Sequence, residues 1–322
     1  MHIVVTGAAG FVGSHLTEEL VRLGHQVTAI DCLLPDSYPA RIKAERLTRL
    51  GRLPQVSPHQ IDLRTAELEP VIEGADVVIN EAAMPGLMKS WSEFSLYTSC
   101  NLLAVDRLIR ASQQVGIGRF VQISTSSVYG QIASGDEDSP TQPFSPYGVS
   151  KLAAEKLVLA HVANFDFPAV VLRYFSIFGP GQRPDMGYSL FCEALLDERS
   201  ITVYGDGQQT RSNTFVSDAV AATIAALTHG ESGAVLNIAG GESISLLRAI
   251  EVLADELGIV ARLEFAAPRP GDQRDTRGDT RRARSVLEWR PLVATEDGLR
   301  RQARWHRERR LTTASAPPPQ IP

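Results

Sequence analysis

A tyrosine and a lysine in this chain are spaced for acid–base chemistry. Tyr147 and Lys151 stand at positions i and i+4 of a stretch with helical character, so both side chains lie on one face of the helix. An ammonium group beside a phenol favours the phenolate, which predicts a lowered pKa for Tyr147 and a general base that works near neutral pH. The same spacing also occurs in ordinary surface pairs on helices, so a purely structural role is the alternative.

A run of hydroxyl side chains ends an apolar strand pattern upstream of this pair. The run is Ser124-Thr125-Ser126-Ser127. Ligands of open parallel sheets bind outside the carboxyl ends of the strands, so these hydroxyl groups are candidates for binding a sugar oxygen. Ordinary turn chemistry is the alternative.

A glycine-rich turn near the start of the chain is a candidate nucleotide site. It runs Gly7-Ala8-Ala9-Gly10-Phe11-Val12-Gly13, between a strand pattern and a helical pattern. Glycines there permit a tight turn and let backbone N–H groups approach a pyrophosphate, while the helix N-terminus favours the anion. We therefore expect Gly7, Gly10, Phe11, Val12 and Gly13 to bind a dinucleotide.

Two acidic positions follow later strand patterns. Asp31 closes the second strand pattern about 20 residues after the turn, where a carboxylate accepts hydrogen bonds from ribose hydroxyls and repels a 2′-phosphate. This position favours NAD over NADP, with a turn or capping role as the alternative. Asp62 and Leu63 are further candidates for the adenine end, and helix capping explains Asp62 equally well.

The elements that must position these residues alternate regularly. Strand patterns cover 3–6, 26–30, 76–80, 119–124 and 169–174, and helical patterns cover 12–23, 101–115 and 147–162. The alternation predicts an α/β fold, a doubly wound parallel sheet with helices on both faces.

Beyond Tyr174 the pattern breaks into loops rich in glycine and proline, which indicates a second, smaller part. We expect residues 1–175 to form the main domain, with 215–240 returning to it through a strand at 234–238. Residues 176–214 and 241–308, including a helix at 243–257, then form a C-terminal substrate lobe that is discontinuous in sequence. Residues 309–322 end in a proline-rich run and are expected to be a disordered tail.

Composition narrows the partners and the compartment. A net charge of -5 gives no bulk positive field for nucleic acid or an anionic membrane. Cys32, Cys100 and Cys192 lack metal-ligand spacing, so we expect buried free thiols, a reducing compartment and no metal. The apolar start at 3–5 leads directly into Thr6-Gly7 and predicts a strand rather than a signal peptide, and no apolar run approaches the roughly 20 residues of a membrane span. We predict a cytoplasmic protein.

Taken together and in this order, the motifs resemble those of the extended short-chain dehydrogenase/reductases, in the nucleotide-sugar epimerase/dehydratase group. The resemblance extends to about Trp305. Its further matches are Ala82-Ala83, Asn101, Val128-Tyr129-Gly130, Arg173-Tyr174-Phe175, Val203-Tyr204-Gly205-Asp206-Gly207, Arg211 and Arg269-Pro270-Gly271-Asp272. It implies a Rossmann-type domain that holds NAD tightly and regenerates it in each cycle, with Ala82 and Asn101 as added cofactor residues.

The resemblance also implies roles in catalysis. Tyr147 is then the base, Lys151 also binds the nicotinamide ribose, and Thr125 hydrogen-bonds the sugar hydroxyl that is oxidised. Helices at 101–115 and 147–162 resemble the pair through which dimers of the family pack as a four-helix bundle, so we expect a homodimer.

For the substrate end, the resemblance implies that Arg211 and Arg269 hold the phosphates of a UDP-sugar and that Asp272 contacts its nucleoside. Two departures fall near these positions and near the cofactor. Asn80 stands where the family usually has histidine, and Ser212-Asn213 replaces the usual Asp-Phe. Neither touches the base, so they bear on local contacts and not on the chemistry.

The residues after Thr125 distinguish between reactions of the group. Its 4,6-dehydratases and UDP-glucuronate decarboxylases carry Asp-Glu or Ser-Glu there, because proton transfers beyond C4 need another acid or base. This chain has Ser126-Ser127. A bound 4-keto sugar then has one easy exit, which is return of the hydride, and return to the opposite face gives the C4 epimer.

The loop from Gly179 to Met186 resembles that of UDP-glucuronate 4-epimerases. Ser176 sits where UDP-glucose 4-epimerases usually carry Asn and the glucuronate enzymes a Thr. A guanidinium at Arg183 and the small hydroxyl of Ser176 suit a C6 carboxylate better than a CH₂OH group. With Ser126 and Ser127 they would hold the carboxylate away from the alignment that releases CO₂.

We therefore predict 4-epimerisation of UDP-glucuronate to UDP-galacturonate. An ion pair between Arg183 and Asp185 is the alternative explanation of that arginine. The nearest alternative function is a UDP-glucose or UDP-N-acetylglucosamine 4-epimerase, and a decarboxylase or 4,6-dehydratase is less favoured. A noncatalytic NAD-binding regulator would be expected to lack the Tyr147 and Lys151 pair, which this chain retains.

Overall fold

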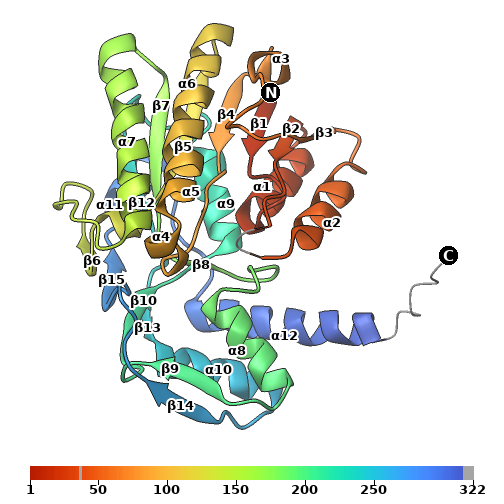
Figure 1. The fold of residues 1–322 in the computed structure, drawn as a ribbon, viewed down its shortest axis with the longest axis vertical. Helices are drawn as coiled ribbons and strands as arrows, with labels where there is room; N and C mark the ends of the chain where they lie inside the picture. The colour runs from red at the N-terminus through yellow and green to blue at the C-terminus, as the bar shows by residue number, and fades with distance from the viewer. Residues whose placement is uncertain (36–37, 315–322) are drawn as a thin grey trace.

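A parallel sheet of seven strands forms the centre of the computed structural model, which describes residues 1–35 and 38–314 (Figure 1). The strand order is β12-β7-β5-β4-β1-β2-β3. The strands are β1 His2–Thr6, β2 Gln26–Asp31, β3 Val56–Gln60, β4 Val77–Asn80, β5 Arg119–Thr125, β7 Ala169–Tyr174 and β12 Val235–Ile238. The predicted Rossmann-type α/β fold is confirmed.

Helices cover both faces of this sheet because successive residues of its strands are apolar and point to opposite faces. Ile3 and Val5 pack in one core with α1 (Phe11–Arg22) and α9 (Val216–Ala225). Val4 between them packs in a second core with α6 (Ala104–Val115) and α7 (Pro146–Phe165). Burial on both faces is typical of parallel strands. The helices α2 (Ala40–Leu50), α3 (Glu69–Ile72), α4 (Lys89–Ser92) and α5 (Phe94–Thr98), the π-helical turn at Ser99–Leu103 and the 3₁₀ turn at Ser126–Val128 complete this part.

The later segments form a smaller part below the sheet in Figure 1, and its sheets are short. One sheet pairs β9 (Ile201–Tyr204) with β14 (Leu263–Ala266), and α10 (Leu246–Leu257) packs between α8 (Gly187–Leu196) and α12 (Thr295–Ala314). Another has the order β13-β10-β15-β6, from Ser243–Ser245, Thr210–Ser212, Asp275–Gly278 and Ile132–Gly135. The two-residue strands β8 (Ile177–Phe178) and β11 (Thr214–Phe215) pair with each other.

Several elements differ from the sequence-based expectation. Strand β3 was not expected, because Pro58 lies within it; the strand is tolerated at the sheet edge, where it pairs only with β2. The helix expected at 243–257 begins at Leu246, after the short strand β13, and Ser245 caps it by accepting from the Arg248 N–H at 3.2 Å.

Two segments cross the boundary expected between the parts. Strand β6, from the first 175 residues, pairs with β15 of the later segments. Helix α11 (Arg281–Leu287) packs on β12 of the main sheet, and the Trp289 indole after it donates to the carbonyl of Asp218 at 2.9 Å. Residues 281–289, which were expected in the lobe, therefore pack against the main domain.

Residues 309–314, which were expected to belong to the tail, are helical. Helix α12 continues through Ala314, and Arg309 and Arg310 form ion pairs with Glu193 and Asp197 near the end of α8. These pairs give the last turns of the helix a partner that the sequence pattern does not reveal. Residues 315–322 of the expected tail lie outside the described residues.

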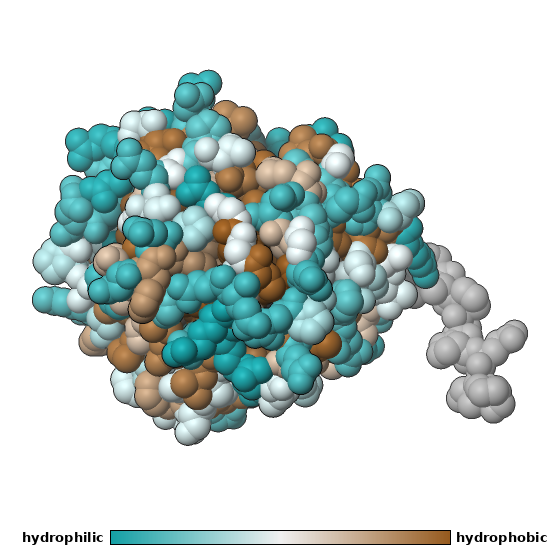
Figure 2. All heavy atoms as spheres, turned by 90° about the horizontal axis from the view of Figure 1, so that it is seen from above, coloured by the Kyte–Doolittle hydropathy of each residue, from teal (hydrophilic) through white to brown (hydrophobic). Residues whose placement is uncertain are grey.

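Within residues 1–35 and 38–314, no helix is long and apolar enough to cross a bilayer, and no three metal-ligating side chains come together. On the face in Figure 2, hydrophobic side chains occur in small groups between hydrophilic ones. Of the cysteines only Cys192 is buried, while Cys100 is partly buried and Cys32 is exposed. The expectation of buried thiols is therefore wrong for Cys32 and Cys100, because both line the cleft that contains the candidate site.

Candidate active site

A cleft of about 890 Å³ lies along the carboxyl ends of the main strands and continues to the smaller part. Its size falls in the upper part of the range for ligand sites. All but one of the residues predicted for the site line it: Gly7, Gly10, Phe11, Val12, Gly13, Asp31, Asp62, Leu63, Ala82, Thr125, Ser126, Ser127, Tyr147, Lys151, Ser176, Arg183, Arg211, Arg269 and Asp272. The exception is Asn101. Residues far apart in the sequence thus share one cavity.

The glycine turn between β1 and α1 leaves no room for side chains. A Cβ atom at Gly13 would lie 2.2 Å from the Gly7 carbonyl oxygen, and one at Gly7, where φ is +68°, would lie 2.8 Å from the nitrogen of Ala82. Helix α1 then begins at Phe11, so its first N–H groups face the cleft. This cradle fits the pyrophosphate of a dinucleotide.

Asp31 ends β2 beside the turn, and its carboxylate is held by the backbone. Oδ2 accepts from the Ala9 N–H at 3.1 Å and Oδ1 from the Leu33 N–H at 2.8 Å. Burial raises the pKa of Asp31, against these hydrogen bonds and the nearby charge of Lys43. Asp62 also lines the cleft, in a bidentate ion pair with Arg64 whose shortest contact is 2.6 Å.

Asn101 holds a loop of the cleft in place from behind. Its Oδ1 accepts from the Met84 N–H at 2.6 Å, and its Nδ2 donates to the Met84 carbonyl and to Ser150 Oγ at 3.0 Å each. With its amide occupied and 1% of its surface exposed, Asn101 positions the segment after β4. The structure thus gives Asn101 a supporting role, and its contact with the cofactor stays a prediction.

The N-terminus of helix α7 positions Tyr147 and Lys151 in the cleft. Ser145 caps it by accepting from the Gly148 N–H at 3.1 Å, and Pro146 occupies the first turn. A Cβ at Gly148 would lie 2.7 Å from the Ser127 carbonyl oxygen, so glycine lets the helix approach the 3₁₀ turn closely. That approach brings the Tyr147 hydroxyl into hydrogen-bonding contact with Thr125.

The pKa of Tyr147 differs from the expectation. Burial raises the pKa of this phenol, because the phenolate loses solvation, and the hydrogen bond with Thr125 and the charge of Arg183 oppose the rise only in part. The predicted lowering by Lys151 is not found. The ammonium of Lys151 instead donates to the Ile123 carbonyl at 2.7 Å, and burial lowers its pKa to about 8.

Asn80, where the family usually has histidine, supports this lysine indirectly. The Thr6 hydroxyl donates to Asn80 Oδ1 at 2.7 Å, and Asn80 Nδ2 donates to Gln122 Oε1 at 2.9 Å. Gln122 in turn donates to the Ile123 carbonyl at 2.9 Å, the same oxygen that accepts from Lys151. The departure thus completes a buried chain between the glycine turn and the catalytic helix.

The three predicted substrate arginines already have partners. Arg183 forms a bidentate pair with Asp185 at 3.0 and 2.7 Å. The Arg269 guanidinium lies 3.5 Å from the ring centre of Tyr204, and Arg211 donates to the Thr210 carbonyl at 2.9 Å. The charges of Arg211 and Arg269 act against the burial that raises the pKa of Asp272, so the three groups are close together.

The other departure, Ser212-Asn213, is accommodated beside Arg211. Ser212 Oγ donates to the Gly240 carbonyl at 2.7 Å. Asn213 Nδ2 donates to the hydroxyl of Tyr188 at 2.7 Å and to the Arg211 carbonyl at 3.3 Å. Both side chains are buried and fix the strand that carries the arginine.

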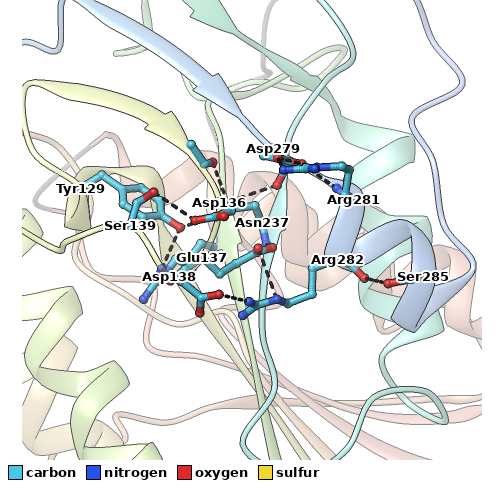
Figure 3. Close-up of polar contacts among 12 residues, drawn as sticks. Tyr129, Asp136, Glu137, Asp138, Ser139, Asn237, Asp279, Arg281, Arg282 and Ser285 are labelled. Atoms are coloured by element: carbon cyan, nitrogen blue, oxygen red, sulfur yellow. Dashed lines mark hydrogen bonds and ion pairs between the residues drawn. The ribbon is translucent and has the colours of Figure 1, made fainter.

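Two matched motifs serve as structural support behind the hydroxyl run. The buried Arg173 pairs with Glu155 at 2.6 Å and donates to the Tyr129 hydroxyl at 2.7 Å, and Tyr129 donates to Asn237 at 2.7 Å. Figure 3 shows how the acidic loop of Asp136, Glu137 and Asp138 joins Asn237, Arg281 and Arg282 in one polar cluster. This cluster links the loop after β6 with β12 and α11.

Sequence reasoning missed several lining residues, chiefly Glu81, Lys43 and Tyr38. Glu81 has a recognisable signal, because an acidic residue directly after the buried strand β4 must sit at the ligand edge of the sheet. Lys43 and Tyr38 have none, because they reach the cleft from helix α2 and the loop before it.

Comparison with known proteins agrees with this geometry. Residues 3–239 match the model of the NAD dependent epimerase/dehydratase family. The chain belongs to this family. Membership confirms the predicted resemblance and NAD as the cofactor.

Relatives of the chain include proteins of three described activities. A Bacillus subtilis (strain 168) protein described as an uncharacterized UDP-glucose epimerase, YtcB, is 38% identical over 93% of this chain and 96% of its own. The UDP-glucuronic acid 4-epimerase of Bacillus cereus, solved with UDP-glucuronic acid and NAD, is 36% identical over 96% and 99%, with a TM-score of 0.91. DesIV of Streptomyces venezuelae, a dTDP-glucose 4,6-dehydratase, is 30% identical over 97% and 98%, with a TM-score of 0.90. Overall similarity does not separate these reactions, so the residues of the cleft must.

Proposed function

We propose that the protein catalyses NAD-dependent 4-epimerisation of UDP-glucuronic acid to UDP-galacturonic acid through a 4-keto intermediate. The position of Arg183 carries the proposal. The positive charge of Arg183 acts to lower the pKa of the Tyr147 phenol, so this cation is near the candidate base. The C6 carboxylate of glucuronate is two bonds from C4, and a guanidinium near the base is therefore well placed to bind it.

Each residue then has one task. The Tyr147 phenolate takes the proton of the 4-hydroxyl while Thr125 hydrogen-bonds the same oxygen, and Lys151 would bind the nicotinamide ribose. Arg211 and Arg269 hold the two phosphates. The glycine turn and Asp31 would hold NAD, which would supply a reversible hydride acceptor at C4.

Retention of CO₂ depends on how the C6 carboxylate of the sugar is held. Arg183, Ser176 and the Ser126 and Ser127 hydroxyls line the same cleft and would fix the carboxylate away from the alignment that breaks its C–C bond. Arg183 must exchange Asp185 for the substrate, and the Asp185 side chain, 36% exposed, is free to turn to solvent.

The decisive assay offers the purified protein UDP-glucuronate and UDP-glucose separately, without added NAD, and resolves products by chromatography. We expect UDP-galacturonate from the first and a much slower reaction with the second. A clear preference for UDP-glucose would replace this proposal with the alternative 4-epimerase of neutral sugars, which the likeness to YtcB favours. Release of CO₂ with a pentose product would indicate a decarboxylase instead.

We also propose a homodimer through α6 and α7, which lie side by side in Figure 1. Leu103 at the start of α6 and Val149 on α7 are 56% and 44% exposed, and Phe94 of the adjoining α5 is 44% exposed. Exposed apolar side chains on neighbouring helices are typical of an interface. Light scattering of the purified protein tests the mass, and a monomer at micromolar concentration contradicts the dimer. A cytoplasmic location stays a prediction.

A further inference from the structure

Glu81 is a carboxyl group inside the cleft for which the proposed reaction has no use. It follows the last residue of β4 and lines the cleft with Lys151 and Tyr174. Its Oε1 atom is buried and has no hydrogen-bond partner among the residues that the structure describes. A buried carboxylate with a free oxygen is costly, because it has lost solvation without full replacement. Either a neighbour compensates its charge, or the group is protonated.

Counting protons along its hydrogen bonds favours the protonated form. Glu81 is hydrogen-bonded to the Tyr174 hydroxyl, which also contacts the hydroxyl of Thr223 on α9. The Thr223 hydroxyl donates to the carbonyl of Ala219 at 2.9 Å, so its oxygen must accept from Tyr174. Tyr174 has then spent its single proton and can only accept from Glu81, which requires a neutral carboxyl group.

An adjacent cation favours the opposite state. Glu81 faces the ammonium of Lys151, and the two groups act on each other: burial raises the pKa of Glu81 to about 7, against the charge of Lys151. Burial lowers the pKa of Lys151 to about 8, against Glu81 and Glu155. Glu155 is already paired with Arg173, which leaves Glu81 as the neighbouring carboxyl whose charge can change.

The other groups around Glu81 complete this balance. Tyr147 on α7 is disfavoured as a phenolate by the charge of Glu81, and Tyr174 on β7 is so buried beside it that the pKa of its phenol rises well above the usual value. Thr223 on α9 and the amide side chains of Asn80 and Gln122 below carry no charge.

We propose that Glu81 is a positioning residue whose proton, held by the Tyr174–Thr223 hydrogen-bond chain, controls the charge states of Lys151 and Tyr147 in turnover. When Glu81 is neutral, the phenolate of Tyr147 is favoured. When Glu81 is ionised, it stabilises the ammonium of Lys151 and opposes the phenolate. This inference depends on the proposed function in one respect, which is that Tyr147 is the base.

The first test needs no substrate. Infrared spectra of the purified holoenzyme, recorded across pH, are compared with those of Glu81→Gln, which keeps the shape and removes the acid. We expect the carbonyl stretch of an un-ionised carboxylic acid in the wild type near neutral pH and its absence in the variant. No such difference at any pH overturns the proposal.

A second variant tests the proton count itself. Thr223→Val is nearly isosteric and removes the oxygen that takes the Tyr174 proton, so Tyr174 becomes free to donate to an ionised Glu81. We expect the acid band of Glu81 to disappear at a lower pH than in the wild type. An unchanged or higher midpoint contradicts the hydrogen-bond chain.

The pH profile of turnover supplies the functional readout. Above the pH at which Glu81 ionises, its charge opposes the Tyr147 phenolate and stabilises the Lys151 ammonium. Glu81→Gln removes this charge and should therefore shift both limbs, where they lie in that range, to lower pH by about one unit. The matched change Glu264→Gln, on an exposed strand of the lobe, should leave both limbs in place. A uniform loss of rate without a shift assigns Glu81 a merely structural role. If UDP-glucuronate is not turned over, the infrared result still stands and the profile is taken on UDP-glucose.

Discussion

The two ends of the cleft are built from different parts of the chain. At the glycine end, defined by Gly7, Gly10 and Gly13, the main chain itself shapes the site and the missing side chains make the room. At the arginine end, defined by Arg183, Arg211 and Arg269, long side chains from separate loops and short strands supply the contacts.

The two ends also differ in what binding must change. The glycine end is set by strand and helix positions and needs no rearrangement to receive a pyrophosphate. At the arginine end the guanidinium groups are paired with Asp185, a carbonyl and an aromatic ring, and a substrate has to replace or share these partners. The backbone therefore shapes the glycine end in advance, while under the proposed function the arginine end would select its substrate by exchange of partners.

The largest effect is expected between the two ends, at the base. Tyr147→Phe should lower kcat by about 10³-fold, because general-base catalysis contributes roughly 10²–10⁴-fold. Binding of UDP-glucuronate, measured by calorimetry, should change little, since the arginine end is untouched. Turnover near the wild-type rate removes Tyr147 from its role.

The glycine end is probed by adding one methyl group. Gly13→Ala places a Cβ within 2.2 Å of the Gly7 carbonyl oxygen, so the turn must open, at a cost of about 2–3 kcal/mol in the free energy of unfolding. We expect lower stability to urea and loss of NAD from the purified protein.

Gly187→Ala is the matched control for this change. Its Cβ would meet only the ring of Phe191 at 3.8 Å, and stability should stay the same or rise slightly. Equal effects of both changes would show that the glycine end is no more constrained than the rest of the fold.

The arginine end is probed through selectivity. Arg183→Gln should lower kcat/KM for UDP-glucuronate by about 10- to 100-fold, since hydrogen bonds to charged groups contribute about 1.5–3 kcal/mol. The value for UDP-glucose should hardly change. Asp185→Asn frees the guanidinium and should preserve or improve the reaction of UDP-glucuronate; equal losses on both sugars contradict carboxylate recognition.

The smallest effect concerns how Arg269 is held. Tyr204→Leu removes the ring beneath the guanidinium and should raise KM about 3-fold, because an exposed cation–π contact contributes about 0.5–1 kcal/mol. Tyr204→Phe keeps the ring and should behave as the wild type. A Leu variant with unchanged KM shows that the loop holds Arg269 by itself.

The same contrast explains what the sequence predicts well. The main sheet and the glycine turn follow from short-range patterns. The alternation of strand and helix patterns and the spacing of the glycines are local properties of the chain. Pairing of β6 with β15 joins residues more than a hundred positions apart, and packing of α11 on β12 joins residues more than forty positions apart, so no local pattern reports either contact.

At the site, residue types were easier to predict than their electrostatics. Tyr147 and Lys151 meet in the cleft as the spacing indicates, but the pKa of Tyr147 rises with burial and Lys151 turns to the Ile123 carbonyl. The motif predicts a cofactor contact for Asn101 but gives no indication that its amide holds the loop at Met84. Burial and hydrogen-bond partners are tertiary properties, which motifs do not encode.

The central claim is that the hydrogen at C4 leaves and returns within one site. UDP-glucuronate carrying deuterium at C4, incubated with the enzyme in ordinary water without added NAD, tests it directly. The account predicts UDP-galacturonate that retains the deuterium at C4, measured by mass spectrometry and proton NMR. Epimerised product with the deuterium lost to solvent, or no epimer at all, would contradict it.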